Sequence, residues 1–581
     1  MKVSDFIARF LAAQGVTHVY ELIGGMIVHM VDSIYQAGEI ELVSVRHEQA
    51  AAFAADVAGR ATGVPGVAMA TSGPGATNLL TGVGSCYLDS SPAVFLTGQV
   101  NRHEQKGERA IRQLGFQETD IVSMVRPITK AAVRVESAEE VPEVLAWAFG
   151  LALEGRPGPV LVDLPMDVQG SEIEAPAPVR VPPRQPAAPA PAAIDALFAD
   201  LAAAERPLVL VGAGVRAAGA TSALRALVDR LGAPVVNSLL AVDALPYSHP
   251  LRVGLIGSYG NRWANMAIGR SDFILVLGSR LDIRQTGSEV AAFKGERVIH
   301  HVDTDVAEIN NRVEGCHEIV CDLRDFFPAA LHLAADRPLP DFGAWVRELS
   351  ELREEWPDTD ELRDVDGINP NVLMHELSTV STDAAAYAVD VGQHQQWAAQ
   401  SLELTEGQRF LTSGGMGAMG FGLPAAIGAS LALGGPVAMI AGDGSFQLNI
   451  QELETIVQRA LPVKMVVVDN ACHGMVRQFQ QSYFDERYQS TLWGYSAPDF
   501  TRVAKAYGIE ALRIETAEEV AEGLRALWRD PKRPFLLQVM VDTMANAYPK
   551  LAFGRPMTEM EPLAKPVAMK GAATPAAMEG T

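Results

Sequence analysis

The chain has 581 residues, of which 48% are hydrophobic, and it carries a formal net charge of −23. This length exceeds what one hydrophobic core supports, so we expect about three domains. The negative charge argues against nucleic acids and anionic membranes as partners, because both attract positively charged protein surfaces.

The N-terminal segment and the cysteines predict a soluble protein. Residues 1–15 follow an amphipathic helical pattern with charged residues and lack the long apolar core of a secretion signal. No apolar run reaches the roughly 18 residues of a membrane-spanning helix. The cysteines are too dispersed for a disulfide framework or a zinc cluster: Cys86, Cys316, Cys321 and Cys472. We therefore expect a cytoplasmic location.

Short apolar runs alternate with helical patterns in three parts of the chain, which predicts an α/β protein with three doubly wound parallel-sheet domains. In the first part, the runs that predict buried strands are residues 42–45, 66–70, 93–96 and 160–162. A Pro/Ala-rich segment predicts an extended linker at 175–193. The domains are expected at 1–174, 194–340 and 365–550, with a tail at 551–581 that is disordered beyond Pro566.

Three motifs in the first two domains have ordinary explanations when each is taken alone. Glu48 lies at the predicted start of a helix, where the helix dipole favours an acidic residue. Gly73-Pro74-Gly75 is by itself a turn. Gly212-Ala213-Gly214 follows a predicted strand, a partial dinucleotide-binding pattern that any tight strand-to-helix turn can use.

The third domain carries the most informative motif, Gly442-Asp443-Gly444. It follows the apolar run 436–441, and Asn470 follows a second run at 463–468, so both polar residues come at the ends of predicted parallel strands joined by a helix at 451–459. Ligands bind at the carboxyl ends of such strands, and a carboxylate with a carboxamide suits Mg²⁺, which also takes phosphate oxygens. The glycines let backbone amides approach a diphosphate. Gly-Asp-Gly alone is commonly a turn, but this arrangement predicts a site for a diphosphate and Mg²⁺.

The order Gly442-Asp443-Gly444 and then Asn470 resembles the signature of thiamine diphosphate (ThDP) enzymes. Within them the chain is most similar to the acetolactate synthase (acetohydroxyacid synthase) group. The resemblance implies pyrimidine-binding, central Rossmann-like and diphosphate-binding domains in that order. Further matching segments are 73–78, 98–99, 116–117, 278–287, 301–305, 390–394 and 412–426.

The resemblance also implies roles for individual residues. Glu48 would activate the aminopyrimidine ring of ThDP, and Met419 would wedge between the two rings. Mg²⁺ would be held by the side chains of Asp443 and Asn470 and by the carbonyl of Cys472. Other contacts to ThDP are implied for Gly24, Pro74, Asn78, Gly392, Gln393, His394, Gly417, Gly444, Ser445, Gly474 and Met475. FAD is implied at Gly212, Gly214, Arg280 and Asp303, and the substrates at Gln99, Phe116, Gln117, Arg280 and Phe479.

The implied reaction decarboxylates pyruvate and transfers the two-carbon unit to a second carbonyl, giving 2-acetolactate for branched-chain amino acid biosynthesis when the acceptor is pyruvate. A keto-sugar nucleotide acceptor, a pyruvate oxidase with redox-active FAD and a non-catalytic paralogue are the alternatives. In this family Glu48 and Asp443 would come from different subunits, which implies at least a homodimer and allows a homotetramer. A regulatory subunit stays open.

Three features depart from the acetolactate synthase pattern near the expected acceptor pocket. Met166 stands where a lysine is common, and Phe479 stands where a tryptophan is common. The loop at 101–112 is longer than usual and rich in basic residues. Such a loop is either a solvated charged surface or a binding element for an acceptor more anionic than a keto acid.

Overall fold

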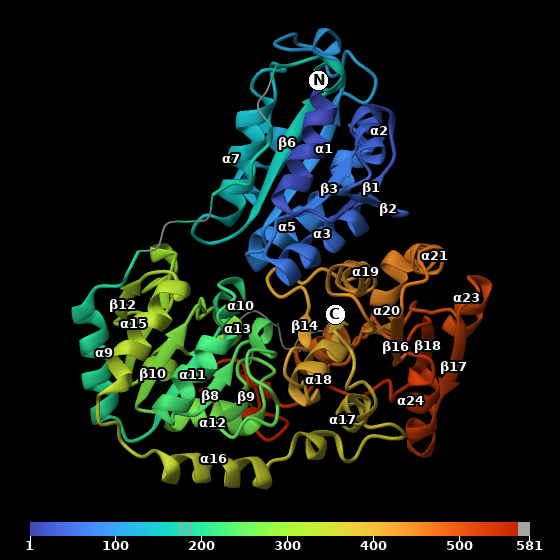
Figure 1. Cartoon of the computed structure of the whole chain (residues 1–581). Coiled ribbons are helices and arrows are strands. Elements are labelled where there is room, and N and C mark those ends of the chain that lie inside the picture. Colours follow the sequence, from blue (N-terminus) through green and yellow to red (C-terminus); the bar gives the residue numbers. More distant parts are fainter. Residues whose placement is uncertain (175–176, 183, 185–186, 568–581) are drawn as a thin grey trace, which may run out of the picture.

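The computed structural model describes residues 1–174, 177–182, 184 and 187–567. Three α/β domains are arranged in a triangle, with the first domain above the other two in Figure 1. Each contains one six-stranded sheet in which the neighbouring strands are parallel. The prediction of three doubly wound domains is confirmed.

The first domain has the strand order β2-β1-β3-β4-β6-β5. Its strands are β1 (His18–Leu22), β2 (Glu41–Ser44), β3 (Gly66–Ala70), β4 (Ala93–Gln99), β5 (Ala131–Arg134) and β6 (Pro159–Pro165). Strands β3, β4 and β6 are buried along their whole length, as expected for central strands covered by helices on both faces. The main helices are α1 (Val3–Gln14), α2 (Val28–Ala37), α3 (Glu48–Thr62), α5 (Leu80–Asp89) and α7 (Val141–Leu153).

The middle domain has the order β12-β11-β10-β7-β8-β9. Its strands are β7 (Pro207–Val211), β8 (Val235–Asn237), β9 (Arg252–Leu255), β10 (Phe273–Leu277), β11 (Val298–Asp303) and β12 (His317–Val320). Its helices include α9 (Pro191–Ala203), α11 (Thr221–Leu231), α12 (Arg262–Arg270), α15 (Leu323–Ala335) and α16 (Gly343–Glu355). Helix α9 begins inside the segment expected to be a linker, because proline fits the first turn of a helix.

The third domain repeats the strand order of the first, as β14-β13-β15-β16-β18-β17. Its strands are β13 (Ala386–Val389), β14 (Arg409–Leu411), β15 (Val437–Gly442), β16 (Val463–Asp469), β17 (Glu510–Ile514) and β18 (Phe535–Met540). Its helices include α17 (Pro370–Val380), α18 (Gln393–Ser401), α19 (Gly422–Leu433), α20 (Asp443–Phe446), α21 (Leu453–Gln458), α22 (Gly474–Tyr483), α23 (Phe500–Ala506) and α24 (Val520–Trp528).

The segment between β15 and β16 differs from the single helix expected at 451–459. A 3-10 turn at Gln447–Glu452 precedes the shorter helix α21. Asn449 leaves the helical conformation, with φ of −132°, and its side chain donates to the carbonyl of Gly420 at 2.7 Å. The helix is shorter than predicted because this side chain bonds to another loop.

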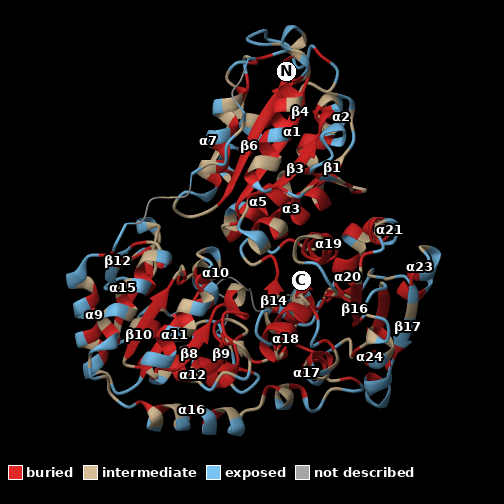
Figure 2. Cartoon of the chain, viewed as in Figure 1, coloured by how far each residue is buried: buried red, intermediate tan, exposed pale blue. Residues whose placement is uncertain are grey.

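Helices α3 and α19 join the first and third domains through one hydrophobic core. The rings of Phe53 and Phe421 meet edge to face at 5.4 Å between centroids. Gly428 of α19 lies against the backbone of Ala54, where a side chain would collide with the carbonyl oxygen. The buried residues of both helices belong to the same cluster, and Figure 2 shows buried segments of the two domains facing each other.

The C-terminal segment returns to the middle domain. Strands β19 (Lys550–Leu551) and β20 (Met560–Glu561) form an antiparallel pair within the range expected for a tail, and Lys550 pairs with Glu561 at 2.9 Å. The prediction of disorder beyond Pro566 falls mostly on residues 568–581, which lie outside the described residues. Among the described helices, none combines the length and apolar character needed to cross a membrane.

Candidate active site

Asp443 and Asn470 lie side by side at the carboxyl ends of β15 and β16. The two strands are parallel neighbours, with Gly442 opposite Val468, so the next residues of each strand meet at one edge of the sheet. Asn470 Oδ1 lies 2.9 Å from the carbonyl oxygen of Cys472 and 3.3 Å from Asp443 Oδ1. Three oxygens with no hydrogen between them thus converge on one point.

The orientation of Asn470 is fixed by its other neighbour. Its Nδ2 donates to Gln393 Oε1 at 3.0 Å, and Gln393 Nε2 donates in turn to the carbonyl of Ala545 at 3.0 Å. If the Asn470 amide were turned over, its nitrogen could donate to the Cys472 carbonyl and to Asp443 Oδ1, but its oxygen would then face Gln393 Oε1. A cation between the three oxygens would resolve this conflict. Mg²⁺ holds oxygens at about 2.1 Å in an octahedron, which places adjacent ligands about 3 Å apart, close to the two distances measured from Asn470 Oδ1.

Asp443 has a second partner that the sequence did not reveal. The hydroxyl of Tyr495 donates to Asp443 Oδ2 at 2.8 Å, which leaves Oδ1 directed toward Asn470. Burial, together with the neighbouring charge of Asp469, raises the pKa of Asp443 to about 7. A bound cation would reverse this effect, because it favours the charged carboxylate.

A cradle for an anion lies beside these oxygens. His394 Nε2 is buried and has no hydrogen-bond partner among the described residues. Burial lowers the pKa of His394 to about 3, so the ring is neutral and can donate through one nitrogen. A side chain at Gly444 would lie 2.7 Å from the ring of His473, and one at Gly474 would overlap Gln393. Gly474 also begins α22, whose N-terminus favours a negative charge.

The loop at 417–420 is held above this edge by Asp390. The Asp390 carboxylate accepts from the backbone amides of Gly420 at 3.0 Å and Gly422 at 2.8 Å. Gly417 has a φ of +64°, a conformation that favours glycine. Gly417 is exposed and Met419 is half-buried, so both can contact a ligand.

In the first domain, Glu48 is held by Asn78. Glu48 is 5% exposed at the start of α3, and its Oε2 accepts from Asn78 Nδ2 at 2.9 Å. Pro74 and Asn78 bound the short helix α4 (Pro74–Asn78), and Gly75 of that helix leaves room for Glu48 Oε1. Within the part of the chain that the structure describes, the hydrogen-bond partners of Glu48 and Asp443 do not overlap. The two carboxylates therefore belong to separate polar clusters of one chain.

The residues expected to face the substrate are dispersed. Gln99 is 2% exposed, and its amide donates to Asp163 at 3.0 Å and to the carbonyl of Thr119 at 2.8 Å. Phe116 is 80% exposed, and Gln117 next to it has a φ of +66°. Phe479 lies on α22 of the third domain, partly exposed and packed against two other aromatic rings. The single chain does not bring these side chains into one pocket.

The charged loop that follows β4 is tied down by acidic residues. The Glu118 carboxylate accepts from the amides of Lys106 at 2.7 Å and Leu114 at 2.8 Å. Arg102 pairs with Asp167 at 2.8 Å. Arg102 thus pairs with the residue that follows Met166 in the sequence, and it also donates to the carbonyl of Glu136 at 2.9 Å.

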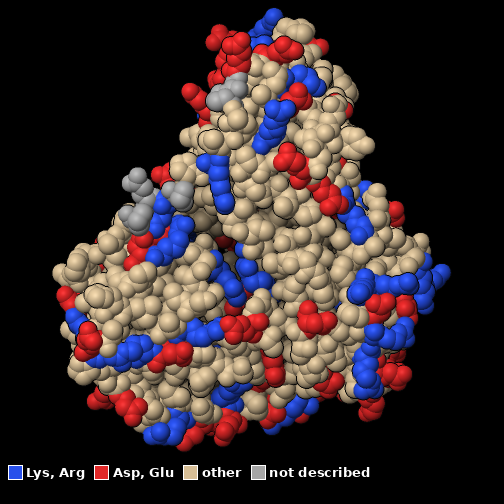
Figure 3. Space-filling model, viewed as in Figure 1, with Lys and Arg blue, Asp and Glu red and all other residues tan. Residues whose placement is uncertain are grey.

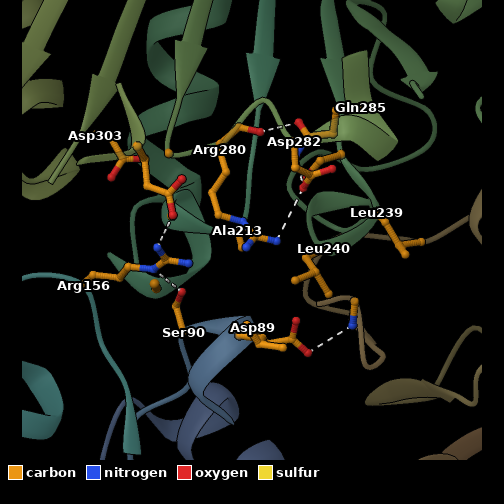
Figure 4. A pocket seen from close by; sticks show the side chains of 18 of the residues that line it. Asp89, Ser90, Arg156, Ala213, Leu239, Leu240, Arg280, Asp282, Gln285 and Asp303 are labelled. Atoms are coloured by element: carbon orange, nitrogen blue, oxygen red, sulfur yellow. Dashed lines mark hydrogen bonds and ion pairs between the residues drawn. The ribbon is translucent and has the colours of Figure 1, made fainter. Parts of the chain in front are cut away.

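A deep cavity lies between the first and middle domains. Gly212, Gly214, Arg280 and Asp303 follow or end the strands β7, β10 and β11, which are neighbours in the sheet. Figure 4 shows Arg280 and Arg156 pointing into this cavity, and Figure 3 shows a hollow with basic side chains where the three domains meet. Gly214 approaches Gly278 so closely that a side chain would lie 2.7 Å from its Cα. This close backbone approach suits a nucleotide.

Two further features of the cavity concern charge. Arg156, which the sequence did not single out, donates to Ser90 Oγ at 2.8 Å and pairs with Glu308. Arg156 comes from the first domain and Glu308 from the middle domain, so the pair joins the two walls of the cavity. Burial raises the pKa of Asp303 to about 6.

Comparisons with known proteins give matches in all three domains. Three models described as thiamine pyrophosphate enzyme domains match the chain: the N-terminal TPP binding domain at residues 1–124, the central domain at 194–330 and the C-terminal TPP binding domain at 390–539. The chain is 37% identical to the acetolactate synthase isozyme 2 large subunit of Escherichia coli over 96% of its own length and 99% of that protein. It is 39% identical to the acetolactate synthase of Arthrospira platensis, over 95% of this chain and 96% of the relative.

Proposed function

The chain belongs to the thiamine pyrophosphate enzyme family, and we propose that it is a carboligase that acts like the acetolactate synthases. It would decarboxylate pyruvate and join the two-carbon unit to a second pyruvate, giving 2-acetolactate and carbon dioxide. The convergence of Asn470 Oδ1, Asp443 Oδ1 and the Cys472 carbonyl carries this proposal, because the three oxygens need a cation and the adjacent cradle accepts a diphosphate.

Asp443, Asn470 and Cys472 would hold Mg²⁺, and the neutral ring of His394 would donate to a diphosphate oxygen. ThDP, when bound, supplies the carbon nucleophile and the electron sink for decarboxylation. The backbone around Gly417 and the side chain of Met419 would orient the rings of the cofactor. The glycines at 442, 444 and 474 let His394, His473 and Gln393 pack against the backbone around the proposed diphosphate site, because side chains there would collide with these residues.

Glu48 would exchange the proton of the cofactor's pyrimidine nitrogen. Asn78 holds Glu48 Oε2 at 2.9 Å, which leaves Oε1 as the atom that moves the proton. The first turn of α3 and the packing of that helix against α19 fix the position of the carboxylate. This rigidity matters because proton transfer requires hydrogen-bond distance in the reacting complex.

Other parts of the proposal concern assembly and FAD. Because Glu48 and Asp443 lie in separate clusters and Phe116 is 80% exposed, we propose a homodimer or homotetramer in which another subunit completes each site. FAD would bind in the cavity lined by Gly214, Arg280 and Asp303, with Gly212 in the turn that precedes Gly214. A regulatory subunit and a cytoplasmic location also stay proposals.

A second candidate differs only in its acceptor. The exposed part of the loop, at 107–114, carries Arg109 and Arg112, which would bind a keto-sugar nucleotide or another anionic acceptor if this loop faces the completed site. Specificity among these acceptors depends on pocket contacts that cofactor motifs do not determine.

One product analysis tests both candidates. The purified protein is incubated with pyruvate, ThDP and Mg²⁺, with and without alternative acceptors, and the products are identified by NMR. We expect 2-acetolactate from pyruvate alone. A product that forms only with a sugar nucleotide would favour the second candidate, acetate would favour an oxidase, and no turnover would contradict both.

A further inference from the structure

Two histidines meet on adjacent strands of the middle domain, at the end of the sheet opposite to the nucleotide cavity. His300 is the third residue of β11 and His317 the first of β12, and they are paired directly across the two parallel strands. Their imidazole rings are stacked, with centroids 4.7 Å apart and planes 17° from parallel. The cavity residues Arg280 and Asp303 lie instead at the carboxyl ends of the strands, so this pair is separate from the proposed cofactor sites.

A carboxylate from a third element completes the group. Asp200 lies on α9, and its Oδ2 is 2.8 Å from His300 Nε2. One potential ligand atom from each of Asp200, His300 and His317 lies within 4.8 Å of the other two. Helix α9 and strands β11 and β12 therefore contribute one ligand atom each to a single position.

Among the described residues, His300 has one ring nitrogen without a partner. It is 1% exposed, its Nε2 faces Asp200, and its Nδ1 has no hydrogen-bond partner in the described part of the chain. A metal ion that replaces the proton between Nε2 and Asp200 would leave the proton of the neutral ring on Nδ1. His317 is exposed and Asp200 is partly exposed, which leaves an entry path from solvent.

We propose that Asp200, His300 and His317 bind a divalent transition-metal ion such as Zn²⁺. Two imidazoles and one carboxylate suit Zn²⁺, whereas Mg²⁺ prefers an all-oxygen site such as that at Asp443. Three protein ligands leave a fourth position for water. Asp200 Oδ2 and His300 Nε2 are already 2.8 Å apart, and the three ligand atoms lie within 4.8 Å of one another. The exposed His317 ring would rotate out of its stack with His300 to reach the spacing of about 3.3 Å that tetrahedral Zn²⁺ requires.

The bound ion would link the first helix of the middle domain to the edge of its sheet. Strand β12 is at the edge and pairs only with β11 among the described strands. Helix α9 begins within the Pro/Ala-rich segment, at Pro191. Metal binding would therefore stabilise the part of the domain that the chain enters first, by mass action on the folded state.

Zinc titration of the full-length protein tests the proposal. The protein is first saturated with ThDP and Mg²⁺, so that the Asp443 site is filled, and Zn²⁺ is added in a calorimeter. We expect the wild type to bind one Zn²⁺ per chain at this site. The Zn²⁺ affinity of this site should be roughly tenfold or more lower in His317→Gln and in Asp200→Asn. The exposed His332 of α15 in the same domain provides the control, and His332→Gln should bind like the wild type.

Thermal unfolding gives a second readout that does not depend on enzymatic activity. Added Zn²⁺ should raise the Tm of the wild type and of His332→Gln, and raise it less in the other two variants. Exposed His317 is the main target because its replacement leaves the core intact, and circular dichroism checks the fold of each variant. Equal stoichiometry, affinity and Tm shifts in wild type, His317→Gln and Asp200→Asn would overturn the proposal.

Discussion

The first and third domains share one strand order but differ in the polar side chains at the ends of their strands. In the first domain, the end of β4 carries Gln99, whose amide donates to Asp163, and Thr97 donates to the same carboxylate at 2.7 Å. At the corresponding end of β16 in the third domain, Asn470 turns its oxygen toward two other oxygens. One sheet edge satisfies its buried polar groups internally. At the other edge acceptor oxygens face one another, although Asn470 Oδ1 also accepts from the Cys472 amide at 3.3 Å. The difference indicates which of two similar edges suits a cation, since oxygens in close contact repel one another.

The largest effect is expected when the oxygen cluster of the third domain is broken. Asp443→Asn removes the only charged member, so Mg²⁺ affinity should fall by roughly 100-fold or more, and turnover with it. Isothermal titration with Mg²⁺ and ThDP measures the binding. Asp366→Asn, at an exposed carboxylate of the same domain, serves as the comparison. A variant Asp443→Asn that binds Mg²⁺ and ThDP like the wild type would show that these oxygens are not the metal ligands.

Replacing Glu48 should separate chemistry from binding. Glu48→Gln keeps the side-chain volume and the contact with Asn78 but cannot exchange a proton, so kcat should fall by roughly 100-fold or more, within the range for general acid–base groups. Binding of ThDP in the presence of Mg²⁺ should persist, because the metal cluster is in the other domain. Steady-state kinetics and ThDP titration are compared, and unchanged turnover would contradict the proposed mechanism.

The internal network of the first domain predicts a dependence of stability on pH. Burial raises the pKa of Asp163 to about 7, although Thr97 and Gln99 donate to it. The folded state thus holds a proton that the unfolded chain releases near pH 3.8, and the stabilisation is lost as the pH rises through 7. Asp163→Asn lacks this pH-dependent contribution to stability. The difference between the Tm of the variant and the Tm of the wild type should therefore shift in favour of the variant between pH 5 and pH 8. The contribution is on the order of a few kcal/mol. A constant Tm difference would show that Asp163 does not titrate in this range.

The smallest effect concerns Tyr495, which supports the metal site from outside. Tyr495→Phe removes the hydroxyl that donates to Asp443 Oδ2, so Mg²⁺ affinity should fall by about tenfold while the fold persists. Tyr507→Phe on the same domain is the matched control, since Tyr507 is not a neighbour of Asp443 in the hydrogen-bond network. Mg²⁺-dependent ThDP binding measures the change, and equal affinities in both variants would exclude a supporting role.

Much of the fold could be predicted from the sequence because buried parallel strands are continuous apolar runs. The runs at 66–70, 93–96 and 463–468 all correspond to strands. The boundaries of the crossover after β15 could not be predicted, since they depend on a hydrogen bond from Asn449 to Gly420, which is distant in sequence. The periodicity of apolar residues indicates which local segments are buried, but it does not indicate hydrogen bonds between segments that are distant in sequence.

The candidate site could be predicted where polar residues directly follow predicted strands, as Asp443 and Asn470 do. Tyr495 and Arg156 lie outside regular elements, so neither periodicity nor spacing identified them. The resemblance placed Gln99 near the substrate, yet in the single chain its amide is bonded to Asp163, a residue on another strand. Such hydrogen-bond partners depend on the tertiary structure. Contacts from the neighbouring subunit that would complete the site depend in addition on the assembly, which local sequence patterns do not encode.

The shared core of α3 and α19 has a consequence for how the protein opens. Because Gly428 packs on the backbone of Ala54 and both helices belong to one cluster, the first and third domains should open as one cooperative unit. A cofactor held by the third domain should then slow amide hydrogen exchange in α3 as well as around its own site. The part of the middle domain built on the separate core of α9, α11 and α15 should exchange independently. Filling the metal site would thus make the backbone around Glu48 more rigid without changing its conformation.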